Sequence, residues 1–492
     1  VITTPVLTYN LQVMVNIFLS AFFMYLLAAR ITRDRIAAFL SGIIFGFCPY
    51  IFTRSWQHLG ETYLWMMPFA LWGLFTMREF PSTRNKALFI CAIALSAISL
   101  NTMYYTAVIM AVFLVYLCMW LLRRGRDKEA GDKRFLKNAL LVGGLAAAAV
   151  LIQIYPYLRK VLTSAGSAAS AFNPYHRPFD DLFTQSAKFF SYLFPVTTHP
   201  VFGKFTEQFI GSPLYGVSYT EHALFLGWTP LVLAFIAFKN RRRERFYVGF
   251  FIWLWIAAWL FSQQPYFSFP AFKIYMPSFF MYKILPMFRA YCRFGIVVML
   301  ATAALAGFGF SFITSRLKNR VRIIAACAIS LLVLFEFLNF PPYKVIDLTK
   351  YPKVYDWLKE QPGDFVIAEY PVDSKSPNEY YRFCQTIHEK KMINGATPGT
   401  NGGRLLNMVS RLSSPDTAGT LSWAGVKYVI VHRGPYDNIA EPEMSGELRM
   451  IGGRRIRGLE FMGDFDGVDV YKVNAPAIGN PFLGDPGKVH GG

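Results

Sequence analysis

Charged side chains at the edges of long apolar runs are the residues of greatest chemical interest in this sequence. Charged groups at membrane depth are energetically costly, so they are retained mainly where they bind an ion, a ligand or one another. Three clusters of this kind stand where an apolar run meets a loop: Arg54, His58 and Glu61; Glu221 with His222; and Arg289 with Arg293. We therefore take these clusters as the candidate functional residues.

The arginines in these clusters predict a binding site for the phosphate of a lipid. A planar guanidinium can bind two phosphate oxygens at once. Arg289 and Arg293 stand four residues apart, so on a helix they would share one face. These two residues, together with Arg54 and His58, are the predicted lipid-phosphate ligands. The alternative is that all four are ordinary interfacial residues whose side chains extend toward the headgroups.

Acidic residues beside these arginines are candidates for acid–base chemistry. A carboxylate near a bound phosphate can accept a proton from an attacking hydroxyl. Glu61 and Glu221 are the two candidates, although neither is assigned as the catalytic residue. Asp180-Asp181 could hold a divalent metal, but a solvated helix N-cap is the favoured interpretation. The six cysteines form no C-x-x-C pair, so they predict neither a zinc site nor a disulfide framework and are interpreted as small buried hydrophobic residues. No cofactor is evident from the sequence.

The composition identifies the class of protein that holds these residues. Hydrophobic residues make up 54% of the 492 positions and charged residues only 16%, whereas a soluble chain usually carries about 25% charge. The net charge of +20 would suggest nucleic-acid binding in a soluble protein. Here the basic residues lie in short loops between apolar runs. A polytopic membrane protein is therefore predicted, and a nucleic-acid partner is not.

Ten apolar runs are candidate membrane-spanning helices, for which about 20 residues are needed, or fewer where the helix ends are buried in protein. The predicted spans are residues 7–29, 36–53, 62–77, 87–100, 103–122, 137–156, 222–238, 246–262, 294–315 and 323–340. Alternate loops between these spans hold 22 basic residues in five short stretches. Because positive loops stay in the cytoplasm, the N-terminus, the loops 157–221 and 263–293 and the C-terminal part are predicted to be extracytoplasmic.

Residues 261–294 differ from the other loops in composition. They contain twelve aromatic residues, interrupted by four prolines. This pattern favours an interfacial or re-entrant segment over a membrane span. The segment could cradle a long isoprenoid chain, or it could be an aromatic belt at the membrane surface.

The apolar runs end at Pro341-Pro342, and a second domain is predicted beyond them. Its predicted elements are helices at 354–360 and 378–390, strands at 365–370 and 426–432, and a hairpin over 459–473. Strands that alternate with helices indicate an α/β domain. The predicted domains are residues 1–340 in the membrane and residues 341–492 outside it. No Lys or Arg precedes Arg30, so we interpret the start as the remainder of a longer chain.

Seven short motifs are spread along almost the whole chain. They are Ala28–Thr32, Phe45–Tyr50 with His58-Leu59, Tyr155–Leu158, Ser191–Pro195, Glu221–Gly227, Phe288–Phe294 and Gly425–His432. In their order and spacing they resemble bacterial membrane proteins of the GT-C glycosyltransferase superfamily, specifically the YfhO-like branch.

This resemblance implies a GT-C fold and the transfer of a sugar from a polyprenyl-phosphate donor. The reaction would occur on the extracytoplasmic face of a bacterial plasma membrane, and the acceptor would be a cell-envelope glycan or a protein. Such enzymes usually carry an acidic catalytic residue in the first extracytoplasmic loop. This chain begins after that loop, so its first span and that loop are expected to be missing. The family's frequent Ser-Ala-Asp also reads Ser186-Ala187-Lys188 here.

Two hypotheses about function follow. The leading one is a glycosyltransferase that uses a lipid-linked sugar. The alternative is a non-catalytic membrane scaffold, or a subunit that handles lipid-linked glycans, whose soluble domain binds a partner. A transporter ranks third, because the spans hold few charges near their centres and show no inverted repeat.

Overall fold

The computed structural model describes residues 4–79, 178–216, 218–284, 286, 288–340, 350–372, 377–396, 401–434 and 445–482, with isolated positions between 85 and 159. The chain separates into two compact units. The helical unit comprises Val1–Ser170 and Tyr175–Tyr343, and the sheet unit comprises Ala171–Pro174 and Lys344–Gly492.

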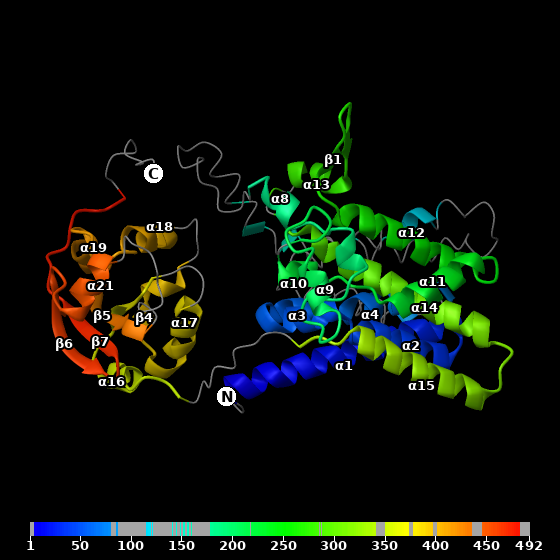
Figure 1. The fold of residues 1–492 in the computed structure, drawn as a ribbon, viewed down its shortest axis with the longest axis horizontal. Coiled ribbons are helices and arrows are strands. Elements are labelled where there is room, and N and C mark those ends of the chain that lie inside the picture. The colour runs from blue at the N-terminus through cyan, green and yellow to red at the C-terminus, as the bar shows by residue number, and fades with distance from the viewer. Residues whose placement is uncertain are drawn as a thin grey trace. The chain divides into compact units, whose positions relative to one another are not determined.

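The helical unit is built on eight helices within its described residues (Figure 1). They are α1 (Pro5–Thr32), α2 (Arg35–Gly46), α3 (Pro49–Gln57), α4 (Met66–Glu79), α11 (Trp228–Lys239), α12 (Arg245–Ser262), α14 (Gly295–Thr314) and α15 (Asn319–Glu336). Shorter elements connect them and gather at one end of the unit.

Local sequence signals set the ends of the first two helices. Thr4 caps α1 with its hydroxyl, and the helix ends at Arg33, whose φ of 55° is left-handed. The side chain of Asp34 then accepts hydrogen bonds from the backbone N–H groups of Ile36 and Ala37 in α2, at 3.1 and 3.2 Å. The chain therefore reverses direction within three residues, which places α2 against α1.

Small residues allow the long helices to approach closely. A Cβ atom added to Gly46 of α2 would stand 2.8 Å from the Cα of Ala21 in α1. A Cβ added to Gly309 of α14 would stand 1.9 Å from the carbonyl oxygen of Leu233 in α11. Close contact between backbones at small residues is typical of helices that pack inside a membrane.

Four helices are long and apolar enough to cross a membrane, counted over the described residues: Val6–Thr32, Arg35–Trp56, Arg245–Ser262 and Tyr291–Thr314. They coincide with four of the predicted spans, and the chain is a helical membrane protein. The helices α4 and α15 lie where the spans 62–77 and 323–340 were predicted. The predicted spans 87–100, 103–122 and 137–156 lie outside the described residues apart from isolated positions. The total of about ten stays a prediction.

The predicted span 222–238 is wrong over its first residues. Residues 223–227 are not helical, and α11 begins at Trp228 after Gly227, which has a φ of 82°. The backbone N–H of Leu226 donates to the carbonyl of Tyr192 at 3.1 Å. The sequence is continuously apolar over 222–238, but residues 223–227 are not helical and bond to the backbone at Tyr192 instead.

One end of the helical unit, the basic end, brings together loops that are far apart in sequence. In Figure 1 the α11–α12 and α14–α15 turns lie at this end. Contacts join the loops there directly: Arg30 to Glu79 at 3.1 Å, Arg243 to the carbonyl of Phe312 at 3.3 Å, and Arg322 to Asp34 in an ion pair. The basic loops after α1, α11 and α14, which the structure describes, therefore share one side in space.

The opposite end, the cluster end, is made of short elements (Figure 1). They are η1 (Leu59–Thr62), α8 (Asp181–Thr184), η4 (Phe190–Tyr192), α9 (Gly203–Glu207), α10 (Tyr219–His222), an antiparallel hairpin of β1 (Tyr266–Ser268) and β2 (Lys273–Tyr275), α13 (Pro277–Ile284) and η5 (Tyr291–Phe294). The aromatic segment 261–294 thus contains a hairpin and a short helix between two candidate spans.

The sheet unit contains a five-stranded sheet in the order β4-β3-β5-β7-β6. Its strands are β3 (Val366–Tyr370), β4 (Lys391–Met392), β5 (Val426–His432), β6 (Leu459–Phe465) and β7 (Val468–Val473). The strand β3 is parallel to both β4 and β5, whereas β7 is antiparallel to β5 and β6. The predicted hairpin coincides with β6 and β7, and Asp466-Gly467 forms its turn.

Apolar side chains on both faces of this sheet are covered by helices. Alternate residues of a strand face opposite sides, so Ile430 packs with Tyr355 while Val429 packs with Leu421. The helices α16 (Val354–Glu360) and α17 (Pro377–His388) contribute to the first core. The second core includes residues of α19 (Thr417–Trp423) and α21 (Ser445–Gly452). The remaining helical pieces are η6 (Ile393–Gly395) and α18 (Asn401–Met408).

Candidate functional site

Four of the residues singled out from the sequence meet in one buried group at the cluster end. Arg54, Glu61, Glu221 and Arg293 form this group, which we call the ion cluster. Arg54 is fully buried, and Glu221 is 5% exposed. Segments separated by more than 150 residues of sequence therefore converge on one site.

Short elements position each member of the ion cluster. Arg54 lies on α3, and Glu61 follows in η1 after the chain turns at His58. Glu221 lies in the single turn of α10, whose cap is Ser218: the Ser218 hydroxyl accepts a hydrogen bond from the Glu221 N–H at 3.3 Å. Arg293 lies in η5, immediately before α14. Each charged residue of the ion cluster therefore lies in a short helical element whose backbone fixes its position.

Each arginine contacts both carboxylates. Two nitrogens of Arg54 donate to the two oxygens of Glu221 at 3.1 and 2.7 Å, and Arg54 Nη1 lies 3.2 Å from Glu61 Oε2. Arg293 Nη2 donates to Glu221 Oε1 at 2.8 Å, and Arg293 also pairs with Glu61. Two positive and two negative charges therefore alternate, and the group is neutral as a whole.

The electrostatics of the ion cluster favour the ionised form of Glu221. Burial alone would raise the pKa of Glu221, but the guanidinium groups of Arg54 and Arg293 outweigh it and hold that pKa well below its usual range. The ring of Tyr50 lies 4.7 Å from Arg54 Cζ, in cation–π contact. The Cys292 thiol donates to Glu221 Oε2 at 3.0 Å. The cluster therefore satisfies buried charge with charge, as buried ions require.

The two histidines near the ion cluster differ in their surroundings. His58 has an exposed side chain, and its pKa is lowered by the partial burial of the ring. His222 is buried, with Nδ1 3.0 Å from the carbonyl oxygen of Ser218 and Nε2 3.0 Å from that of Ser186. Burial also lowers the pKa of His222. His58 thus faces outward, while His222 ties two loops together.

The prediction that Arg289 and Arg293 share one helix face is wrong. Residues 288–290 are not helical, and η5 begins only at Tyr291. Arg293 turns into the ion cluster, whereas Arg289 pairs with Asp181 at 3.3 Å and keeps 43% of its side chain exposed. The two arginines therefore belong to different surroundings. Asp180 stands at the N-cap of α8 as predicted, but its side chain makes no capping hydrogen bond.

Two further polar residues of this end were given no role in the site by the sequence analysis. Cys292 was interpreted as a small hydrophobic residue, yet its thiol contacts Glu221. Lys188 donates to the carbonyl of Phe183 at 2.8 Å and to Gln264 Oε1 at 3.1 Å. Burial lowers the pKa of Lys188. The position of Cys292 directly before Arg293 was the available signal.

Comparisons with known proteins identify a family for this chain and a solved structure that shares its fold. A family model described as "Domain of unknown function (DUF6311)" matches residues 4–335. No curated protein matches the chain. A cryo-EM structure of the arabinofuranosyltransferase AftD from Mycobacteria is 16% identical with a TM-score of 0.51, and the match covers 95% of this chain and 34% of that one. A mutant of AftD from Mycobacteria gives 16% identity, a TM-score of 0.49, and coverage of 96% and 35%.

The likeness to the first of these structures extends over almost the whole of this chain but about a third of the length of AftD. At this identity it shows that this chain and AftD share a fold, and it supports the GT-C-like fold that the sequence resemblance implied. The more specific assignment to the YfhO-like branch stays a prediction.

Proposed function

The chain belongs to the family described as "Domain of unknown function (DUF6311)", and from this premise we propose that it is a membrane glycosyltransferase. The donor in this proposal is a sugar carried on a polyprenyl phosphate, and the acceptor is a glycan or protein of the cell envelope. The observation that carries the proposal is the fold shared with an arabinofuranosyltransferase. Because one fold can host several functions, the residues of the cluster end must supply the rest of the argument.

The proposed location is a bacterial plasma membrane, with the cluster end and the sheet unit facing away from the cytoplasm. The convergence of Arg30, Arg243 and Arg322 at the basic end supports this orientation, because basic loops are retained in the cytoplasm. A polyprenyl-linked sugar would then meet the protein at the cluster end.

In this proposal the ion cluster holds the site together and does not perform acid–base chemistry. A general base works best when its pKa lies near the operating pH, and the pKa of Glu221 is held well below that range. Each arginine of the cluster is also neutralised by two carboxylates. Arg54 and Arg293 are therefore positioning residues in this account, and none of the described residues is proposed as the catalytic base.

Arg289 is the best-placed of the predicted phosphate ligands. Its side chain is partly exposed, and the partner given by its ion pair, Asp181, lies at 3.3 Å. A phosphate can join such an exposed pair without disrupting a buried group. His58, exposed beside the ion cluster, is the second candidate. Arg289 is therefore the proposed ligand of the donor phosphate, and His58 is the alternative ligand in separate surroundings.

One observation favours the non-catalytic alternative. Both carboxylates that were candidates for acid–base chemistry, Glu61 and Glu221, are engaged by two arginines each. A subunit that only binds or presents a lipid-linked glycan would need the phosphate ligands but not a base.

Purified protein in nanodiscs separates these possibilities. We expect the wild-type chain to bind a polyprenyl-phosphate sugar and to release or transfer the sugar. Arg289→Lys keeps the charge but loses the planar fork, so donor affinity should fall about tenfold. Binding without turnover would favour the non-catalytic subunit. No binding of any polyprenyl-phosphate pentose or hexose would contradict both.

The matched control is Arg242→Lys, which makes the same change at an exposed position of the basic end. Its donor affinity should equal that of the wild type. Equal affinity in Arg289→Lys as well would remove Arg289 from the site.

A further inference from the structure

The segment between α12 and η5 presents exposed apolar side chains that the proposed function does not explain. It leaves the candidate span Arg245–Ser262 and returns to the candidate span Tyr291–Thr314. Both of its ends are therefore attached to membrane helices. Between them lie the β1–β2 hairpin and α13.

Large apolar side chains of this segment are exposed within the described structure. Ile284 is 77% exposed and Phe280 is 56% exposed. Four more residues on the hairpin and its turn are also exposed: Phe269, Phe272, Ile274 and Tyr275. A contiguous apolar surface of this kind marks an interaction site.

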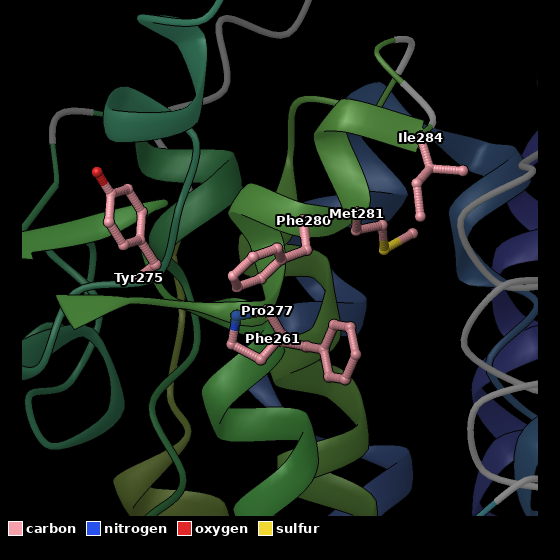
Figure 2. A pocket seen from close by; sticks show the side chains of 6 residues that line it. All are labelled: Phe261, Tyr275, Pro277, Phe280, Met281 and Ile284. Carbon is pink, nitrogen blue, oxygen red and sulfur yellow. The ribbon is translucent and has the colours of Figure 1, made fainter.

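A pocket of about 430 Å³ opens among these side chains. It is lined by Phe261, Tyr275, Pro277, Phe280, Met281 and Ile284. In Figure 2, Met281 and Ile284 extend down from α13 toward the side of Phe261, which comes from the last turn of α12. The pocket thus begins where a candidate membrane span ends, and its lining is almost wholly hydrocarbon.

The charges of the segment have one sign. Between residues 263 and 288 the only charged residues are Lys273 and Lys283. Their ammonium groups lie 4.6 Å from the ring centres of Tyr266 and Phe279, respectively. Both lysines are exposed and both rings are half-buried. Exposed lysines beside aromatic rings fit the headgroup region of a membrane that carries negative charge.

We propose that residues 263–288 lie in the interface of the bilayer and that the pocket holds an acyl chain of an anionic phospholipid. The apolar lining of the pocket fits an acyl chain, and the two lysines fit a negatively charged headgroup. The segment is joined at both ends to candidate membrane spans, which places it at the interface of the bilayer. The occupant is a bilayer lipid and not the sugar donor. This inference does not rest on glycosyl transfer and survives if the proposed function fails.

Photocrosslinking in native membranes tests the proposal. With p-benzoylphenylalanine in place of Phe280, irradiation should give an adduct whose mass is that of the chain plus one anionic phospholipid. The control places the same group at Trp423, an exposed aromatic residue of α19 in the sheet unit, and should give no lipid adduct. An isoprenoid adduct, a dimer of the chain, or no adduct at Phe280 would each overturn the proposal.

The lysines provide a second test by native mass spectrometry of the chain released from nanodiscs that contain phosphatidylglycerol. The double variant Lys273→Gln/Lys283→Gln should retain several-fold less phosphatidylglycerol than the double arginine variant, which keeps both charges. Size exclusion should show both variants as folded and monodisperse. Equal retention in the two variants would contradict the role of the lysines.

Discussion

The two ends of the helical unit handle charge in opposite ways. At the basic end, cations pair singly with acids that remain partly exposed, as Arg30 does with Glu79. At the cluster end, two arginines and two glutamates close into one buried, neutral group. The basic end is thus characterised by an excess of one sign of charge, whereas the cluster end is characterised by the geometry of paired charges.

The largest predicted effect comes from opening the ion cluster. Glu221→Gln leaves two buried arginines facing one carboxylate, so the free energy of unfolding should fall by about 3–5 kcal/mol. Equilibrium unfolding in detergent measures this. Glu207→Gln, at an exposed acid of α9 on the same end, should change stability by less than about 0.5 kcal/mol. A similar small loss in both variants would mean that the cluster does not stabilise the fold.

Removing one positive and one negative charge together should destabilise the fold by less than the sum of the two single substitutions. Removing Arg293 and Glu61 together leaves the bidentate pair of Arg54 and Glu221 intact. In a double-mutant cycle with glutamine at both positions, the coupling energy should be about 1–3 kcal/mol. Additive losses would show that the two residues act independently, contrary to the contacts.

Breaking a pair at the basic end should have a smaller effect. Arg322→Gln removes the partner of Asp34, but Asp34 still caps α2 and accepts a hydrogen bond from Ser311 at 2.8 Å. We expect a loss of about 1 kcal/mol, because Asp34 keeps these hydrogen bonds when the Arg322 guanidinium is removed. A loss as large as that of Glu221→Gln would remove the contrast between the two ends.

The smallest predicted effect concerns pH. A carboxylate whose pKa is depressed in the folded state adds stability above its unfolded pKa, and this is lost only as the pH falls through the folded pKa. Because the pKa of Glu221 is well below its usual range, the difference in melting temperature between wild type and Glu221→Gln should stay constant from pH 8 to pH 5. A difference that shrinks below pH 6 would show that Glu221 takes up a proton there.

The sequence was sufficient to predict the features that depend on composition. Basic residues that recur in alternate loops predicted one charged end, and Arg30, Arg243 and Arg322 do meet there. Continuous apolar runs predicted α1 and α12. Composition did not predict features that depend on backbone hydrogen bonds between distant segments. Residues 223–227 are an example, because they are apolar but not helical.

The sequence analysis singled out the four residues of the ion cluster but did not predict that they contact one another. Arg54, Glu61, Glu221 and Arg293 were each singled out, because each is a charge beside an apolar run. Their mutual contact was missed, since it joins segments that are more than 150 residues apart and lies outside any local motif. Equal numbers of opposite charges at one predicted membrane face would have been a usable signal. Arg289 was grouped with Arg293 because a helix was assumed there.

The orientation of the two ends is the claim on which the rest of this account depends, and thiol labelling tests it directly. Cysteine replaces Lys204 on α9 at the cluster end and Lys318 at the basic end, both of which are exposed, and labelling is compared with the unaltered chain. An impermeant maleimide should label Lys204→Cys in intact cells and label Lys318→Cys only after permeabilisation. The reverse pattern would place the ion cluster in the cytoplasm and contradict the proposed site of sugar transfer.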